Sequence, residues 1–244
     1  MASGIIVRGL WGDMSVPAYD RSLREAARRV RAKSFNLERE NCRIFAFGLE
    51  NTAFLDSLGV EWICLSSDPL VNWTAATDRN PSEDGRVNWG LSHWRHKLEC
   101  IRAGLTVSEA VIWLDWDCHL CEPLPADFWD RLATGPPFRA SLRFYRHRQV
   151  SRPGRMAGRY VPHGAWQYFR RDWIDRAIET HARRCPGATD EVGMAYFLDE
   201  LHDGWIGVEQ WAKLYEPDCY DQRHRLRQII PLAGRPLFRN WGRW

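Results

Sequence analysis

Short apolar runs and stretches of helical periodicity alternate through the first half of the chain. Runs rich in β-favouring residues predict strands over residues 5–10, 43–47, 60–65 and 111–114. Apolar residues at helical spacing, with caps or glycines at the ends, predict helices over residues 19–33, 51–58 and 91–103. Strands and helices that alternate in this way are typical of a parallel sheet with helical crossovers.

The second half of the chain is less regular. It predicts strands over residues 138–145 and 160–169, and helices over 127–132, from Asp172 to about Arg184, and after Thr189. The stretches 72–88 and 146–159 are turn-rich and predict loops, whereas the aromatic tail, 205–244, favours packing over the sheet. The whole pattern predicts one α/β domain of Rossmann type, with a mostly parallel central sheet and helices on both faces.

The strand predicted over residues 111–114 ends abruptly in two acids one residue apart, Asp115 and Asp117. Side chains alternate along an extended chain, so both carboxylates face the same way. In an open α/β sheet, the carboxyl ends of the strands are where ligands bind. Paired carboxylate oxygens there suit Mg²⁺ or Mn²⁺ held jointly with substrate phosphates. The alternative is a strand that simply runs out into solvent, with two acids on its loop.

The composition is that of a globular protein, with 45% hydrophobic and 27% charged residues among 244. The chain shows no apolar stretch of membrane-spanning length and no layout of a secretory signal, so we expect a cytoplasmic protein without a transmembrane segment. Seven scattered cysteines favour reduced thiols over a disulfide framework. Cys118 and Cys121 form a C-x-x-C pair, but the sequence has no second close pair to complete a zinc site.

Positive charge is carried by 31 arginines and only three lysines. A GC-rich genome would give the same bias, but the distribution of the arginines is also uneven. Between Asp130 and Asp172 there is no acid, and arginines interleave with aromatic residues. Such a segment suits a polyanion, including nucleic acid, and its candidate contacts are Arg143, Arg146, Arg148 and Arg155. The alternative is a solvated strand–loop–strand face whose aromatic residues belong to the core.

The order of these features resembles the nucleotide-sugar-dependent glycosyltransferases of the GT-A type, in which strand–helix units lead to a strand that ends in D-x-D. The segment VPHGAWQYFRRDWIDR, 161–176, is similar to one in glycogenin-like and bacterial galactosyltransferase-like enzymes, and Gly164, Phe169 and Trp173 keep its pattern. Asp190 and Glu191 stand where those enzymes have Asp-Gln. The terminal segment 229–241 is similar to their H-x-x-G-x-x-K-P-W, except that Pro231 falls near the place of the metal-binding histidine.

The resemblance implies a GT-A-like domain with a nucleotide-sugar-binding half, 1–120, and an acceptor-binding half, 121–244. It implies Mn²⁺ or Mg²⁺ held by Asp115 and Asp117, with His224 and Asn240 as substitutes for the missing histidine. The residues expected to contact the donor, most simply a UDP-sugar, are Arg8, Trp11, Asp68, His93, Lys97, Asp115, His163 and Gly164. Asp190 and Glu191 would contact the donor sugar or act as the general base.

The acceptor implied by the resemblance is a hydroxyl group. The basic, aromatic-rich segment favours a polyanionic acceptor, such as hydroxymethylated DNA of the phage type or a phosphorylated glycan or lipid.

Each assignment has a structural alternative. Lys97 could be a solvated helix residue, Trp11 a core residue, and His163 a satisfied polar group. Asp190 and Glu191 could simply complement a helix dipole.

Two other classes of protein also fit part of the pattern. A haloacid-dehalogenase-like phosphatase also uses D-x-D, but on its first strand and with a later lysine and acidic pair, whereas only Lys213 lies downstream here. A non-catalytic nucleic-acid-binding module would use the basic segment alone.

Overall fold

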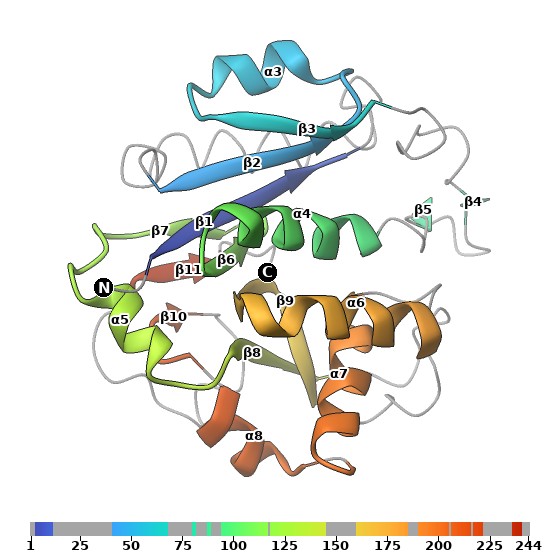
Figure 1. Ribbon diagram of the computed structural model, residues 1–244, viewed down its shortest axis with the longest axis vertical. Helices are drawn as coiled ribbons and strands as arrows, with labels where there is room; N and C mark the ends of the chain where they lie inside the picture. The colour runs from blue at the N-terminus through green and yellow to red at the C-terminus, as the bar shows by residue number, and fades with distance from the viewer. Residues whose placement is uncertain are drawn as a thin grey trace.

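The largest sheet of the described residues has six strands, in the order β3–β2–β1–β6–β9–β8 (Figure 1). Its strands are β1 (Gly4–Leu10), β2 (Cys42–Phe47), β3 (Trp62–Ser66), β6 (Ala110–Leu114), β8 (Phe138–Phe144) and β9 (Tyr160–Arg170). Strand β1 is parallel to β2 and β6, and β2 is parallel to β3. Strand β9 runs antiparallel to both β6 and β8. The prediction of an α/β fold with a mostly parallel central sheet is therefore confirmed.

The computed structural model describes residues 3–11, 41–67, 80–81, 87–88, 94–116, 118–144, 160–184, 190–204, 206–215, 217–221 and 236–240. The predicted helix over 19–33 and most of the predicted loops, 72–88 and 146–159, lie outside these residues. Within them, every helix is too short or too polar to cross a membrane.

The described helices are α3 (Thr52–Ser57), α4 (Trp94–Val107), α5 (Phe128–Ala133), α6 (Arg171–Arg184), α7 (Asp190–Leu201) and α8 (Val208–Tyr215). The sequence predicted all of these except α8. The helix predicted over residues 91–103 was expected to end at the following residue, Gly104. Helix α4 instead continues to Val107. A Cβ atom at Gly104 would lie 2.7 Å from Val7 and 2.9 Å from Val111, so this glycine allows α4 to pack closely on the sheet. Helix α6 begins at Arg171, directly after β9, which puts Asp172 in its first turn instead of at its cap.

The two faces of the sheet carry separate cores because side chains alternate along the strands. On central strand β6, Ala110, Ile112 and Leu114 belong to one core, and Val111 and Trp113 to the other. The first core is covered by α3, α5 and a small second sheet, and the second by α4, α6, α7 and α8. Helices thus lie on both faces, as predicted, and every residue of β6 is buried.

The second sheet has the order β10–β11–β7 and was not predicted. It joins β7 (Cys118–Leu120), just after the acidic pair, to β11 (Phe238–Asn240) and β10 (Tyr220–Asp221) in the tail. Phe238 is fully buried, with its ring centroid 5.9 Å from that of Trp166 of β9. The described part of the tail therefore packs over the central sheet, as its aromatic content indicated. Two short strands, β4 (Asn80–Pro81) and β5 (Val87–Asn88), pair within the stretch predicted as a loop.

Helices α6 and α7 pack closely at Gly193. A Cβ atom there would lie 2.4 Å from His181 Cδ2. We expect Gly193→Ala to lower the free energy of unfolding by about 1–3 kcal/mol, because overpacking outweighs the gain in helix propensity. Urea unfolding measures the change. The matched control is Gly207→Ala, where an added Cβ meets nothing within 4 Å. Equal stability of the two variants would contradict this account of the α6–α7 contact.

The stability of the fold should fall at alkaline pH because Cys219 is buried beside the second sheet. Burial, with Asp218 nearby, raises the pKa of the Cys219 thiol from 9.0 to about 12. The unfolded thiol ionises first, so this contribution is complete below pH 9.0 and is lost as the pH rises toward 12. We expect Cys219→Ala to show a shallower loss of stability over that range than the unchanged protein. Each protein is compared with its own stability at pH 7, and identical slopes would contradict the assignment.

Candidate functional site

The order of strands along the sheet reverses direction between β1 and β6. From β1 the chain proceeds to β2 and β3 on one side, whereas β6 lies on the other side of β1. In open α/β sheets, a ligand site forms outside the carboxyl ends of the strands at such a switch point. Trp11 follows the end of β1, and Asp115 follows the end of β6, so these two predicted site residues leave the sheet at the same edge.

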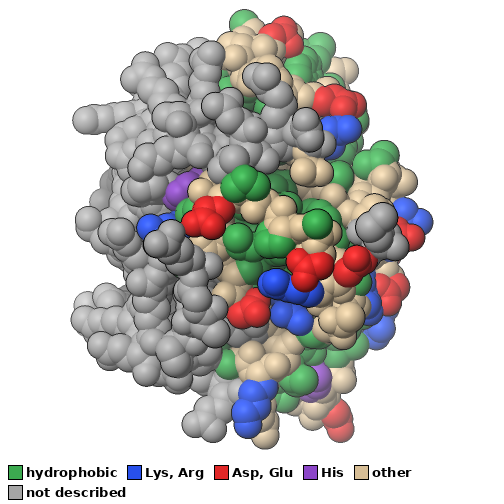
Figure 2. All heavy atoms as spheres, turned by 90° about the vertical axis from the view of Figure 1, so that its left-hand side faces the viewer, with side chains coloured by type: hydrophobic (Ala, Val, Ile, Leu, Met, Phe, Trp, Pro, Cys, Tyr) green, Lys and Arg blue, Asp and Glu red, His purple; other side chains and the backbone are tan. Residues whose placement is uncertain are grey.

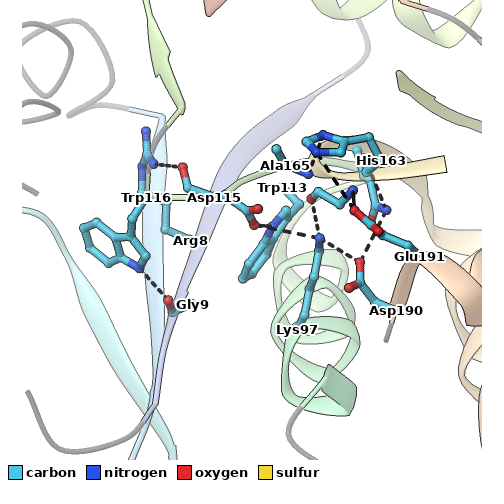
Figure 3. A network of polar contacts seen from close by, with 12 residues as sticks. Arg8, Gly9, Lys97, Trp113, Asp115, Trp116, His163, Ala165, Asp190 and Glu191 are labelled. Atoms are coloured by element: carbon cyan, nitrogen blue, oxygen red, sulfur yellow. Dashed lines mark hydrogen bonds and ion pairs between the residues drawn. The ribbon is translucent and has the colours of Figure 1, made fainter. Parts of the chain in front are cut away.

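Asp115 is fixed at this edge and yet open to solvent. Its Oδ1 accepts a 2.6 Å hydrogen bond from Trp113 Nε1, and its backbone N–H donates to Ala165 O at 2.9 Å (Figure 3). Its side chain nevertheless remains 42% exposed. A carboxylate that is held on one side and exposed on the other is well suited to bind a cation or a donor group of a ligand.

The loop after Asp115 is tied to β1 by the buried side chain of Arg8. The Arg8 guanidinium donates to the backbone carbonyls of Asp115 and Cys118, each at 2.8 Å. Trp116 Nε1 donates to Gly9 O at 2.7 Å, a second tie to the same strand. Because Arg8 is 0% exposed, the structure gives it the role of fixing this loop. The predicted contact between Arg8 and a nucleotide stays a prediction.

Lys97 of α4 lies at the centre of the polar network in Figure 3. Its Nζ is 2.8 Å from Asp190 Oδ2 and 3.9 Å from Asp115 Oδ1, and it donates a hydrogen bond to Gly164 O. Lys97 is 2% exposed, so the alternative of a solvated helix residue is wrong. Burial lowers the pKa of Lys97, but the carboxylates of Asp190 and Asp115 outweigh it and leave this pKa above its ordinary value. The ammonium is therefore charged at neutral pH.

Gly164 of β9 holds the network together through its backbone. Its N–H donates to Glu191 Oε1 at 2.9 Å while its carbonyl accepts from Lys97. A Cβ atom at this position would lie 2.9 Å from Lys97 Nζ and 3.2 Å from Asp190 Oδ2. The absence of a side chain at residue 164 therefore lets α4 and α7 bring opposite charges together over the strand.

His163 lies at the outer side of the same network. Its Nδ1 accepts a 3.3 Å hydrogen bond from the Ala165 N–H, which puts the proton of the neutral ring on Nε2. That Nε2 is 4.0 Å from Glu191 Oε1. With its side chain 17% exposed, His163 can present an N–H donor at the rim of the site.

Asp190 and Glu191 begin α7, where acids complement the helix dipole. Both are buried, with 1% and 6% exposure, and both are engaged by the network. Gln167, fully buried on β9, adds a 3.5 Å contact from its Nε2 to Asp190 Oδ2. Gln167 was not predicted as a site residue, although its position four residues after His163 on the same strand indicates a shared face. The structure thus brings the two predicted catalytic acids into the site, and their catalytic role stays a prediction.

Trp11 belongs to an aromatic group at the ends of β1 and β2. Its ring stacks near that of Trp113, with centroids 6.3 Å apart, and meets His96 edge-on at 5.8 Å. His96 in turn stacks on Phe47 at 3.9 Å. Trp11 is half-buried, so it packs against the core without being fully enclosed by it. The sequence analysis missed His96 because one histidine on a helix gives no signal of its partners.

Seven predicted site residues lie outside the described part of the chain, and the structure does not test them: Asp68, His93, Asp117, Arg146, Arg148, Arg155 and His224. Arg143 and Asn240 are described only as backbone positions of β8 and β11. The backbone of Asn240 pairs with that of Cys118, which directly follows Asp117. The tail strand that carries Asn240 therefore pairs with β7, the strand that follows the acidic pair in sequence.

Asp115 is the part of the predicted metal site that the structure describes with its side chain. Within the described ranges, no three histidine, cysteine or acidic side chains form a group that could hold a metal ion. Asp190 and Glu191 are already engaged by Lys97 and Gly164. The described residues therefore supply one carboxylate of the predicted metal site, that of Asp115, and metal binding at this edge stays a prediction.

No protein-family model matches the chain, and no curated protein matches it either.

The role of Arg8 can be tested by a change that keeps its charge. We expect Arg8→Lys to lower the free energy of unfolding by about 1–3 kcal/mol, because an ammonium with a shorter reach leaves a buried carbonyl of the loop unpaired. Urea unfolding measures the loss. Arg102→Lys, at a half-exposed arginine paired with Glu99 on the same helix, serves as the control and should change stability by less than about 0.5 kcal/mol. Equal effects of the two changes would contradict the anchoring role.

Proposed function

We propose that the chain transfers a sugar from a nucleoside-diphosphate sugar to a hydroxyl acceptor, with the help of a divalent cation. The observation that carries the proposal is the position of Asp115. It is a fixed, half-exposed carboxylate at the switch point of a mostly parallel sheet, beside a network that holds two more acids. The resemblance of the D-x-D region and of residues 161–176 to GT-A-type transferases supports the same reaction.

In this proposal, Asp115 and Asp117 hold Mn²⁺ or Mg²⁺, with Asn240 or His224 as a further ligand. The pairing of residue 240 with Cys118 supports Asn240 as that further ligand. When bound, the ion would act as a Lewis acid and offset the negative charge that builds on the leaving diphosphate. Arg8 and Trp116 keep the intervening loop in position against β1.

The nucleotide would lie along the edge formed by the ends of β1 and β2, next to the half-buried Trp11. Aromatic rings bind nucleobases by stacking, and the cluster around His96 and Phe47 fixes the orientation of Trp11. Asp68, which follows the end of β3 in sequence, remains our candidate for the ribose or base, and His93 for a phosphate.

The sugar and the acceptor hydroxyl would meet near His163. The Nε2–H of its neutral ring can donate to a sugar or phosphate oxygen. Of the two acids that begin α7, Asp190 is bound by Lys97 at 2.8 Å, whereas Glu191 faces His163. Glu191 is therefore the better candidate for the general base that accepts the proton of the acceptor.

The nature of the acceptor rests on the basic segment, most of which lies outside the described residues. On the face shown in Figure 2, acidic and basic side chains of the described residues are intermixed. In our proposal, a polyanionic acceptor, such as modified DNA or a phosphorylated glycan or lipid, would contact the arginines of residues 143–155. Binding of duplex DNA that weakens steeply with salt would support it.

Thermal unfolding with UDP-, GDP- and TDP-sugars, each with and without MnCl₂, tests the function. We expect one donor to raise the unfolding temperature by roughly 5 °C at 100 times its Kd, and only when Mn²⁺ is present. Asp115→Asn and Asp117→Asn should abolish this shift because the cation loses an ionised ligand. Asp175→Asn, at an exposed acid on α6, is the control and should keep it.

Two outcomes contradict the proposal. The first is a shift that does not need the metal, or that survives in Asp117→Asn. The second is stabilisation by duplex DNA alone, without nucleotide or metal, which would favour the non-catalytic nucleic-acid-binding module.

A further inference from the structure

We infer that Lys97 is a positioning residue, which orients Asp115 from inside the protein and does not itself bind the donor. This inference rests on the proposed function, because it concerns how Asp115 is presented to a cation and a diphosphate. It departs from the expectation, drawn from the resemblance, that Lys97 would contact the donor.

The hydrogen-bonding capacity of Lys97 is already directed inward. An ammonium has three N–H donors. One donates to Gly164 O, a second faces Asp190 Oδ2 at 2.8 Å, and Asp115 Oδ1 lies 3.9 Å from the same nitrogen. The Lys97 side chain is 3% exposed, so a phosphate could reach it only by displacing one of these groups. Four elements, α4, β6, β9 and α7, converge on this one nitrogen.

The same contacts decide how Asp115 is oriented. Its Oδ1 receives the indole N–H of Trp113 and faces the ammonium of Lys97, and both partners lie beneath the edge of the sheet. The two side chains also contact each other, with Lys97 Nζ 5.1 Å from the centroid of the Trp113 ring. This pair of contacts turns one oxygen of Asp115 inward, and the exposed 42% of the side chain faces the edge of the sheet.

The positive charge of Lys97, taken by itself, would weaken the binding of a metal ion to Asp115. A positive charge close to a carboxylate weakens the attraction of that carboxylate for a metal ion. Positioning by Lys97 strengthens metal binding if it fixes the ligand in place, as outer partners of metal ligands commonly do. Replacing Lys97 by itself therefore mixes two effects of opposite sign, and a test must separate them.

A paired substitution separates the effect of charge from that of position. Lys97→Met removes one positive charge, and Asp190→Asn removes one negative charge, so the double variant keeps the net charge of the network. It loses the ion pair and the contact with Asp115. A change in metal affinity in this variant then reports the position of Asp115 and not the local field.

The experiment is a calorimetric titration of MnCl₂ in the presence of UDP, on the full chain. The proteins are the unchanged chain, Lys97→Met/Asp190→Asn, and Lys213→Met, which alters an exposed lysine of α8 and serves as the control. We expect the double variant to bind Mn²⁺ about 10–100-fold more weakly than the unchanged chain, as is usual when the partner of a metal ligand is lost. The control should bind as the unchanged chain does.

Wild-type affinity in the double variant would overturn the inference and leave the proposed function standing. Absence of Mn²⁺ binding in the unchanged chain would refute the proposed function, and with it the inference.

A second measurement uses only the unchanged chain and so does not depend on whether a variant folds. Reductive methylation of the unchanged, ligand-free chain should modify Lys213 readily and leave Lys97 unmodified until the protein unfolds. Rapid methylation of Lys97 would also overturn the inference, because an accessible ammonium is not held inside.

Discussion

The geometry of this protein depends on one buried ammonium group. An isolated charge in a protein interior is strongly unfavourable, and a buried lysine is tolerated only when opposite charges and acceptors surround it. Lys97 meets this requirement with Asp190, Asp115 and the carbonyl of Gly164. These groups come from separate elements, so the need to neutralise Lys97 fixes where α4 and α7 lie relative to β6 and β9. The acids that neutralise Lys97, together with Glu191, form the network at the edge of the sheet.

A second buried cation, Arg8, is satisfied in a different way. Its guanidinium donates to the backbone carbonyls of Asp115 and Cys118. Arg8 therefore holds the loop after β6 in place, whereas Lys97 neutralises acidic side chains. The difference follows from chemistry: the guanidinium fork reaches two acceptors at once, whereas the ammonium acts as a compact charge. Lys97 thus contacts the carboxylate of Asp115, and Arg8 binds the backbone of the loop that follows it. A carboxylate supported in this way can remain half-exposed without losing its orientation.

The sequence predicted the framework well because the framework depends on local pattern. Apolar runs gave the strands of the central sheet, and the switch from Leu114 to Asp115 correctly marked the edge where β6 ends. Gly104 was misread as the end of α4 because its role, close packing on Val7 and Val111, is a tertiary contact. The second sheet was missed because β7 and β11 are three residues each and pair across more than a hundred positions. The burial of Lys97 and the contacts of Gln167 were likewise set by packing between distant segments, which periodicity does not reveal.

We propose that Asp115 and Asp117 hold a divalent cation against a diphosphate at this edge of the sheet. A crystal of the full chain, grown with MnCl₂ and UDP, tests it most directly through the anomalous signal of manganese. We expect a peak about 2 Å from oxygens of Asp115, Asp117 and the diphosphate, next to Trp11. The proposal is contradicted if the diphosphate binds elsewhere, or if the metal is absent from Asp115 while the nucleotide is bound.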